Sequence, residues 1–321
     1  MGAVSSVGRP NSANLPLCIV HGNCQATALS AVLSSSPAFA TEYDIVRVPA
    51  VHTITVGEVS ELKELIARAS LIIAQPVKPG YRGMGLGTDE LIPAAPSACR
   101  VIRIPGLYHQ GLFPFQAFVS VNSEGRRSVG DIPFTGRHHD LRIIACAAQA
   151  MDADTAVDWV RSYVPEVTAL REIADVAAAD VRRRERETDI PVFDLITSSR
   201  ATHAESFFTV NHPSRLALRH ISEGVHRTLG IPFDDVGTDE LLDPLRTPLE
   251  LPVLKALGLP PEGRSHWVVQ GKDVPMAAVV EAHLGFYREH PEAVPAALRA
   301  HVGRFRRLAL LRVRPALALL E

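Results

Sequence analysis

Short apolar runs alternate with amphipathic segments along the first third of the chain, and this alternation predicts the fold. Leu17–Val20 is an apolar run that stops at polar residues, and a helical pattern of apolar positions follows from Ala28. Residues 43–49 and 70–74 are further apolar runs, with a helical pattern over 56–69 between them. Such alternation is typical of a parallel sheet covered by helices. We therefore expect an α/β fold with a mainly parallel sheet.

The later part of the chain is predicted to add one more strand and then mostly helices. A glycine-rich loop at 78–91, in which Thr88 or Asp89 is expected to cap the next helix, leads to a strand at 99–105. Helical patterns follow, and they cover residues 140–148, 153–163, 167–188, 215–229, 274–287 and 293–311. The aromatic segment 111–136 fits either a lid or a plain hydrophobic loop, and the proline-rich segment 231–261 is expected to be extended.

Composition and charge narrow the class of protein. The chain has 321 residues, of which 46% are hydrophobic and 21% charged, as in ordinary globular proteins. A net charge of −2 gives no general attraction to nucleic acid or to anionic membranes. No apolar run approaches the ~20 residues that a membrane span needs, and the polar start of the chain lacks the order of a signal peptide. We expect a cytoplasmic protein without nucleic-acid partners.

The four cysteines differ in their surroundings. They show no paired CxxC spacing, which favours a reducing compartment over a disulfide-bonded protein. Cys18, Cys99 and Cys146 lie in apolar runs and are interpreted as small core residues. Cys24 instead stands at the turn between the first strand and its helix. Open α/β sheets bind their ligands at such turns, and a helix amino terminus favours a thiolate. Cys24 is therefore the leading candidate for a nucleophile.

A base for this thiol could come from a distant loop. His212 follows an apolar element at 206–210, and an imidazole can accept the proton of a thiol and return it to a leaving group. The position three residues earlier is Thr209, so the chain lacks an acid there. Spacing alone leaves a second interpretation open, in which Cys24 is a buried structural thiol and His212 a surface histidine.

Polar residues near Cys24 could complete an active site. Gly22 permits close backbone approach or a positive φ, while Asn23, Gln25 and Gln75 carry amide groups that could serve an oxyanion hole. Gln75 ends the third predicted strand at the level of the Cys24 turn. A plain strand-end residue before a proline is the alternative interpretation of Gln75.

Other polar residues could have binding roles. His138-His139-Asp140 could supply a base or a metal ligand, although Asp140 is equally explained as a helix N-cap. No HxxxH, HExxH or paired CxxC spacing occurs, so no metal site is expected. The 78–91 loop has neither a P-loop nor a dinucleotide fingerprint, but its basic residues, with Arg103, could hold phosphates. The charge run at 182–187 is interpreted as a solvated helix face, and the arginine-rich stretch 304–314 as a packed terminal helix.

Six motifs in order between residues 16 and 260 carry a family resemblance. They are HGNCQ at 21–25, IIAQPV at 72–77, PGYRGMGLGT at 79–88, HHD at 138–140, FFTVNHPSR at 207–215 and TPLELPVLKALGL at 247–259. Together they resemble the WcbI family of polysaccharide-biosynthesis proteins. More weakly, the chain is similar to SGNH hydrolases and acetyltransferases. The resemblance implies an SGNH- or flavodoxin-like core over 16–260. Outside it, the polar residues 1–15 are expected to be a disordered leader, and the helical pattern within 261–321 predicts a helical extension packed on the core.

The resemblance also implies a function. It implies binding of coenzyme A and transfer of an acyl group, typically acetyl, to a hydroxyl or amine of a sugar or small-molecule acceptor. Cys24 would be the nucleophile or thiol-contacting residue and His212 the general base, with Asn211, Asp140 or His109 as the third member. The residues expected to contact the coenzyme are Gly22, Gln25, Lys78, Tyr81, Arg82, His109, His139 and Arg215. A thiol esterase of the SGNH kind and a non-catalytic module that binds coenzyme A or glycan are the alternatives, and the acceptor and oligomeric state stay open.

Overall fold

The computed structural model describes residues 7–10, 14–119, 137–197, 206–235 and 239–311. The chain forms two compact units that are interleaved along the sequence. The first unit comprises residues 1–108, 180–207 and 211–242, and the second comprises 109–179, 208–210 and 243–321. These units follow contacts in space. The predicted division into 1–15, 16–260 and 261–321 instead cuts the chain into consecutive stretches of sequence. It stays a prediction.

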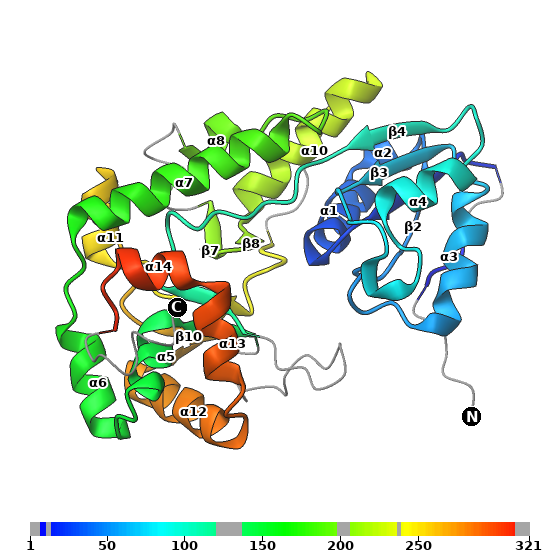
Figure 1. The fold of residues 1–321 in the computed structure, drawn as a ribbon. Helices are drawn as coiled ribbons and strands as arrows, with labels where there is room; N and C mark the ends of the chain where they lie inside the picture. Colours follow the sequence, from blue (N-terminus) through cyan, green and yellow to red (C-terminus); the bar gives the residue numbers. More distant parts are fainter. Residues whose placement is uncertain (1–6, 11–13, 120–136, 198–205, 236–238, 312–321) are drawn as a thin grey trace. The chain divides into compact units, whose positions relative to one another are not determined.

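A four-stranded parallel sheet forms the centre of the first unit (Figure 1). Its strands are β1 (Leu17–His21), β2 (Asp44–Val46), β3 (Leu71–Ala74) and β4 (Arg100–Arg103), in the order β2-β1-β3-β4. β1 pairs with β3 up to His21 and Ala74, so the residues that follow the two strands emerge at one edge of the sheet. The α/β prediction with a parallel, helix-covered sheet is confirmed.

Helices and short 3-10 turns lie between these strands or follow them along the chain. Those between the strands are α1 (Cys24–Ser35), α2 (Pro37–Ala40), η1 (Val56–Glu58), α3 (Val59–Ile66), η2 (Tyr81–Gly83), α4 (Thr88–Leu91) and η3 (Ile92–Ala94), and those that follow are α8 (Phe193–Thr197) and α10 (Arg215–Leu229). Inward-facing side chains of α3, such as Leu62 and Ile66, pack with Ile19 and Ile72 of the sheet to form a buried core. Burial of such apolar area is the main stabilising contribution.

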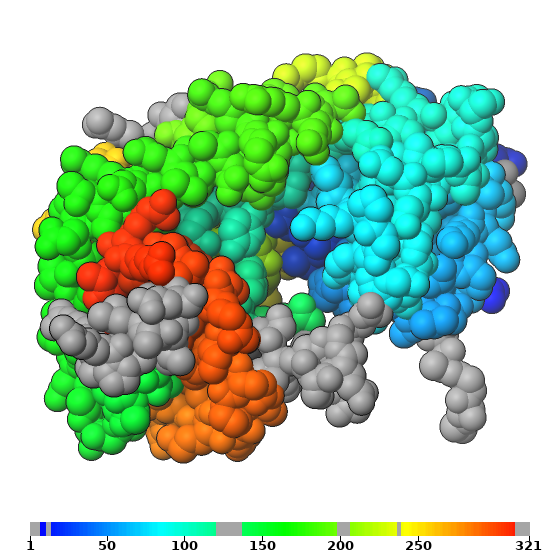
Figure 2. All heavy atoms as spheres, in the orientation of Figure 1, coloured from blue at the N-terminus to red at the C-terminus, as the bar shows by residue number. Residues whose placement is uncertain are grey.

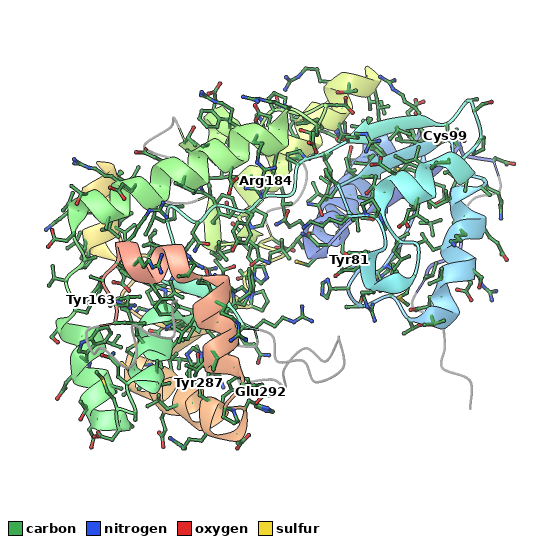
Figure 3. All side chains as sticks on the ribbon, in the orientation of Figure 1. Tyr81, Cys99, Tyr163, Arg184, Tyr287 and Glu292 are labelled. Atoms are coloured by element: carbon green, nitrogen blue, oxygen red, sulfur yellow. The ribbon has the colours of Figure 1, made fainter. Side chains whose placement is uncertain are left out.

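Two predictions for this unit are wrong. Thr88 does not cap α4, because it lies inside the helix and Gly87 holds the N-cap position. Its hydroxyl instead donates to the carbonyl oxygen of Gln75 at 2.6 Å and accepts from the Val77 N–H at 2.9 Å. Cys99 is only partly buried, because it precedes β4 at the edge of the sheet (Figure 3), whereas Cys18 is fully buried.

The second unit combines two small antiparallel sheets with a set of helices. β5 (Gln116–Phe118) pairs with β6 (His138–Asp140), and β9 (Leu245–Arg246), β10 (Trp267–Val269) and β11 (Lys272–Val274) form the other sheet. Its helices are α5 (Leu141–Ala148), α6 (Ala153–Ser162), α11 (Leu251–Leu257), α12 (Met276–Glu289), α13 (Ala293–Ala300) and α14 (Val302–Arg307). Figure 2 shows α12 to α14 in orange and red at the surface of this unit.

Several sequence predictions for the remaining chain can be compared with these elements. Asp140 caps α5, because its side chain accepts a hydrogen bond from the Arg142 N–H. This confirms the interpretation of Asp140 as a helix N-cap. The extended prediction for 231–261 is wrong, because α11 lies within it. The helix predicted over 293–311 is broken between α13 and α14 at His301. Cys146 is fully buried, as expected. Residues 120–136 of the predicted lid or loop lie outside the described residues.

The chain passes between the units within α7 (Val167–Glu185) and near β7 (Phe207–Thr209) and β8 (His212–Pro213). Val167–Glu185 confirms the helix predicted there, three residues shorter at its end than expected. A search of the described residues for a helix of membrane-spanning length and hydropathy found none.

Candidate active site

A tight turn places Cys24 at the start of α1. β1 ends at His21, and Asn23 caps the helix by accepting the Gln25 N–H at 2.9 Å on its side-chain oxygen. Gly22 lies between them and is closely approached by Gln75. A Cβ atom on Gly22 would lie 2.4 Å from Gln75 Oε1 and 2.9 Å from the Cβ of Ala26. Glycine at this position therefore lets the amide of Gln75 reach the turn.

Two buried glutamines connect the loops at this edge of the sheet. Gln75 Oε1 accepts from the Asn23 N–H at 3.0 Å, and its Nε2 donates to Gln25 Oε1 at 2.9 Å and to the Pro105 carbonyl at 3.4 Å. Gln25 Nε2 donates to the Leu107 carbonyl at 2.6 Å, and Gln25 Oε1 accepts from the Leu107 N–H at 2.9 Å. The side-chain amides therefore fix the loops that follow β1, β3 and β4.

The same network reaches the stretch that carries His212. The second N–H of Gln25 Nε2 donates to the Asn211 carbonyl at 2.7 Å. Cys24 precedes Gln25 and His212 follows Asn211, so this bond joins the two stretches within the first unit. α1 and α10 also pack together, with Ala28 and Leu218 in one apolar cluster. Cys24 and His212, which are 188 positions apart in the sequence, therefore lie in one compact unit.

Arg184 is a residue of this region that the sequence analysis missed. Its Nη1 donates to the Gly106 carbonyl at 3.1 Å and its Nη2 to the Tyr108 carbonyl at 2.6 Å. One guanidinium therefore binds the carbonyl groups on both sides of Leu107. Partial burial lowers the pKa of Arg184. The prediction of a solvated helix face is therefore wrong at this position. A charge run in the sequence gives no signal of which member meets a row of carbonyl groups.

Burial keeps both the thiol and the imidazole neutral. Desolvation raises the pKa of Cys24 above its ordinary value of 9.0, against the smaller effect of hydrogen bonds from its own N–H and that of Gln25. The helix terminus favours the thiolate as expected, through these hydrogen bonds, but burial has the larger effect on the pKa of Cys24 in the free protein. Burial also lowers the pKa of His212 to about 4. At neutral pH His212 is unprotonated, which is the form of a general base.

Comparison with known proteins identifies the family. The family model described as polysaccharide biosynthesis enzyme WcbI matches residues 17–234. The chain belongs to the WcbI family. One similar solved structure has a TM-score of 0.71 at 21% sequence identity, and the match covers 96% of this chain and 98% of the other. That structure is described as WcbI, a novel polysaccharide biosynthesis enzyme, in its native form without a disulfide bond between coenzyme A and a cysteine. No curated protein matches the sequence.

The basic residues predicted to bind the coenzyme lie in different settings in this WcbI-family protein. Lys78 is exposed and Tyr81 half-buried, on the loop that follows β3 (Figure 3). Arg82 Nη1 donates to the carbonyls of His52 at 3.0 Å and Ile54 at 2.7 Å, so it holds a neighbouring loop. Arg103 is ion-paired with an exposed carboxylate, that of Asp89, at 2.9 Å.

Arg215, at the start of α10, is also occupied. Its guanidinium pairs with Asp235 at 3.1 Å, and its backbone N–H donates to Glu240 at 2.7 Å. Arg215 and Cys24 both belong to the first unit of the WcbI-family chain.

The remaining predicted histidines belong to the second unit. His109 and His139 are each 1% exposed. His139 Nδ1 is hydrogen-bonded to the hydroxyl of Tyr287 at 2.6 Å, and its ring stacks on His283 at 4.6 Å between centroids. Burial and the neighbouring histidines hold the pKa of His139 well below its ordinary value.

Asp140, proposed from sequence as a possible third member of the site, lies in a buried ion cluster of the second unit. Arg142 Nη2 pairs with Asp140 at 2.7 Å and with Glu250 at 2.6 Å. The carboxylate of Asp140 is therefore committed to Arg142. Within the described ranges, no group of three or more histidine, cysteine, aspartate or glutamate side chains is arranged to hold a metal ion.

Proposed function

We propose that this WcbI-family protein is an acyltransferase that takes an acyl group from an acyl-coenzyme A. The acceptor would be a hydroxyl or amine of a polysaccharide precursor or a related small molecule. The observation that carries the proposal is the bond from Gln25 to the Asn211 carbonyl at 2.7 Å, which ties the stretch with the thiol to the stretch with the imidazole. Family membership and the mention of coenzyme A beside a cysteine in the similar structure support it.

Because His212 is unprotonated and Cys24 is a neutral thiol, the reaction would start with proton transfer between them. His212, with a pKa of about 4, accepts the proton of the Cys24 thiol as the sulfur attacks the thioester carbonyl. The C–S bond of the thioester breaks, and His212 returns the proton to the departing thiolate. His212 then accepts the proton of the acceptor hydroxyl or amine as its oxygen or nitrogen attacks the acyl group. The bond to Cys24 breaks, and the proton returns to its sulfur.

A direct transfer, without an acyl group on Cys24, is the other route. His212 would then deprotonate the acceptor, and Cys24 would contact the thioester. Intact-mass spectrometry separates the two routes, because only the first leaves an acyl group on Cys24.

The side-chain amides of Gln25 and Gln75 are not available to the developing oxyanion. Gln25 and Gln75 direct their side-chain N–H groups at fixed carbonyl or amide oxygens. We therefore assign these glutamines a positioning role. The helix dipole at the start of α1 would favour the negative charge of the oxyanion.

The loop after β3 fits an anionic coenzyme. It leaves the sheet at the edge where Cys24 stands, and it carries the exposed cation Lys78, the half-buried ring of Tyr81 and the guanidinium of Arg82. Lys78 would bind phosphate oxygens as a point charge, while Arg82 would hold the loop in shape. The bound thioester would supply the activated acyl group.

Intact-mass spectrometry with acetyl-coenzyme A tests the acyl-enzyme route. We expect one added acetyl group on the protein, lost in Cys24→Ala and retained in the matched variant Cys99→Ala, which changes the other half-buried cysteine of this unit. His212→Ala should slow its appearance by about 100-fold or more. Release of coenzyme A at an unchanged rate in both Cys24→Ala and His212→Ala would refute the proposal.

A non-catalytic binding module is the second candidate, and the raised pKa of Cys24 is the observation that favours it. A thiol that is neutral at rest could line a coenzyme site without reacting. Calorimetry would then show coenzyme A binding with no acyl product from any acceptor. An SGNH-like thiol esterase would instead turn over a nitrophenyl ester with water alone.

A further inference from the structure

A pocket of about 160 Å³ lies in the first unit, apart from Cys24. It is lined by α1, by the start of α10 and by the segment that follows α10; the lining used below comprises Val32, Arg215, Arg219, Phe233, Asp235 and Asp239. We propose that this pocket binds a neutral sugar residue of the acceptor. This sugar residue would be a different one from the sugar residue that receives the acyl group. The inference rests on the proposed function, because it names a subsite for the acceptor.

The polar wall of the pocket is fixed by ion pairs. Asp235 accepts from Arg215 Nη2 at 3.1 Å and lies 3.0 Å from Arg219 Nε. The neighbouring Asp234 accepts the Ala38 N–H at 3.0 Å and also hydrogen-bonds the buried hydroxyl of Ser36. Planar guanidinium and carboxylate groups held in this way present donors and acceptors in set directions, as the hydroxyls of a sugar require.

The charge of the pocket argues against phosphate. Its lining carries three aspartates and two arginines, so the net charge is −1. Asp235 already pairs with both arginines, and Asp239 is exposed with no hydrogen bond or ion pair to the other described residues. A carboxylate in that state accepts hydrogen bonds from hydroxyl groups and repels phosphate. The pocket is therefore unsuited to the anionic end of coenzyme A.

The other side of the pocket is apolar. The half-buried ring of Phe233 is held by the edge of His226 at 5.3 Å between centroids and by the guanidinium of Arg219 at 5.3 Å. Ala31 and Val32 of α1 add methyl groups. A pocket with an aromatic ring and methyl groups on one side and planar polar groups on the other matches a pyranose, which has C–H faces and a rim of hydroxyls.

The position of the pocket on α1 explains why it would bind a remote sugar unit. Cys24, Ala28 and Val32 follow one another at intervals of four and so share one face of the helix. Val32 lies about 12 Å along the axis from Cys24, at 1.5 Å per residue. Ala28, Leu218 and Leu242 form a buried cluster against this face. Binding energy from such a remote unit can serve the reaction at the thiol.

Methyl NMR on the full chain tests the subsite without any catalysis. Protein labelled in its alanine and valine methyl groups is titrated with the methyl pyranosides of common hexoses and N-acetylhexosamines. We expect at least one of them to shift the methyl signals of Ala31 and Val32 and to leave those of Val279, in the second unit, unmoved. Asp239→Asn should raise the dissociation constant about tenfold, as should Phe233→Ala, while the exposed matched control Asp154→Asn should not change it.

The outcomes separate this proposal from the proposed function. If none of the pyranosides shifts the Ala31 and Val32 signals, or if coenzyme A shifts them through this pocket, the subsite is refuted even when Cys24 is acylated. If a pyranoside binds and Asp239→Asn weakens it, the subsite is supported even when no acyl transfer occurs. Cys24→Ala should bind the same pyranoside with unchanged affinity, because the thiol lies outside the pocket.

Discussion

Gln25 donates a hydrogen bond of 2.7 Å to the carbonyl of Asn211, 186 positions further along the chain. The bond joins a side chain to the backbone, so the partner could be almost any residue type at position 211. Its effect is to fix where the loop before α10 lies relative to the start of α1. Cys24 precedes Gln25 and His212 follows Asn211, so the buried amide of Gln25 helps to position both residues.

Removing the Gln25 amide should damage both stability and activity. Gln25→Met keeps the side-chain length but leaves the Leu107 N–H, the Leu107 and Asn211 carbonyls and the Gln75 amide without their partner. We expect a loss of about 3 kcal/mol in the free energy of unfolding in urea and a strongly slowed acylation of Cys24. The control Gln149→Met removes a hydrogen bond to a helix-end carbonyl and should cost less than about 1 kcal/mol. Equal losses in the two variants would contradict this role.

Gly22→Ala should be destabilising although it adds only one methyl group. The new Cβ would lie 2.4 Å from Gln75 Oε1 and 2.9 Å from the Ala26 Cβ, and the hydrogen bonds of Gln75 resist its displacement. We expect a loss of about 2 kcal/mol in thermal or urea unfolding. Gly57→Ala is the matched control, because nothing lies within 4 Å of its Cβ position. A Gly22→Ala protein as stable as Gly57→Ala would show that the turn is not closely packed.

Arg184→Met should loosen the loop that holds Gln25. It removes the donors to the Gly106 and Tyr108 carbonyls, so amide hydrogen exchange of residues 106–108 should become faster. Acyl transfer should slow by about tenfold through misplacement of the Cys24 turn. The neighbouring Arg183→Met removes only an exposed pair with Asp180 and should change neither measurement. Faster exchange without any effect on transfer would restrict Arg184 to a structural role.

The reactivity of Cys24 should report its raised pKa. In the free protein, we expect the rate of alkylation by iodoacetamide to keep rising beyond pH 9.0, because burial disfavours the thiolate. Acyl transfer, in contrast, should persist at neutral pH and fall as the pH drops through about 4, where His212 becomes protonated. A plateau of the alkylation rate below neutral pH would show that the thiolate is stabilised at rest.

Acid should destabilise the second unit through His283. This side chain is fully buried, and burial lowers its pKa to about 4 from an ordinary 6.5. The unfolded chain binds a proton below 6.5 and the folded chain does not until about 4, so the stability from neutral His283 is full above 6.5 and is lost as the pH falls to about 4. The expected loss is about 3 kcal/mol. Urea unfolding across this range, with a ring titration by NMR, checks it; a midpoint near 6.5 for the His283 ring would contradict it.

The sequence predicted elements that depend on local pattern. The apolar spacing of 215–229 indicated a helix, and α10 has those bounds. The parallel sheet followed from alternating runs, and the cap at Asp140 from its residue type. α11 was missed because prolines suggested extended chain, although Pro252 lies in the first turn of α11, where proline is favoured.

Features that depend on contacts between distant segments could not be predicted. The charge run at 182–187 does not show which of its members faces the carbonyls of Gly106 and Tyr108. The pKa of Cys24 depends on how deeply α10 and its neighbours bury the thiol. This burial changes the pKa more than the N–H groups of the helix terminus do. Cys24 and His212 lie in one unit, and their catalytic roles stay a prediction.

The interleaving of the two units sets an order of events during synthesis. The thiol leaves the ribosome before the second unit's first stretch, 109–179, whereas His212 and α10 follow only after that whole stretch has been made. Contacts of such high contact order form slowly. A nascent or prematurely terminated chain therefore carries its cysteine before the helix that buries it exists. During that interval the cell's thiol chemistry, and not the folded protein, governs the fate of this sulfur.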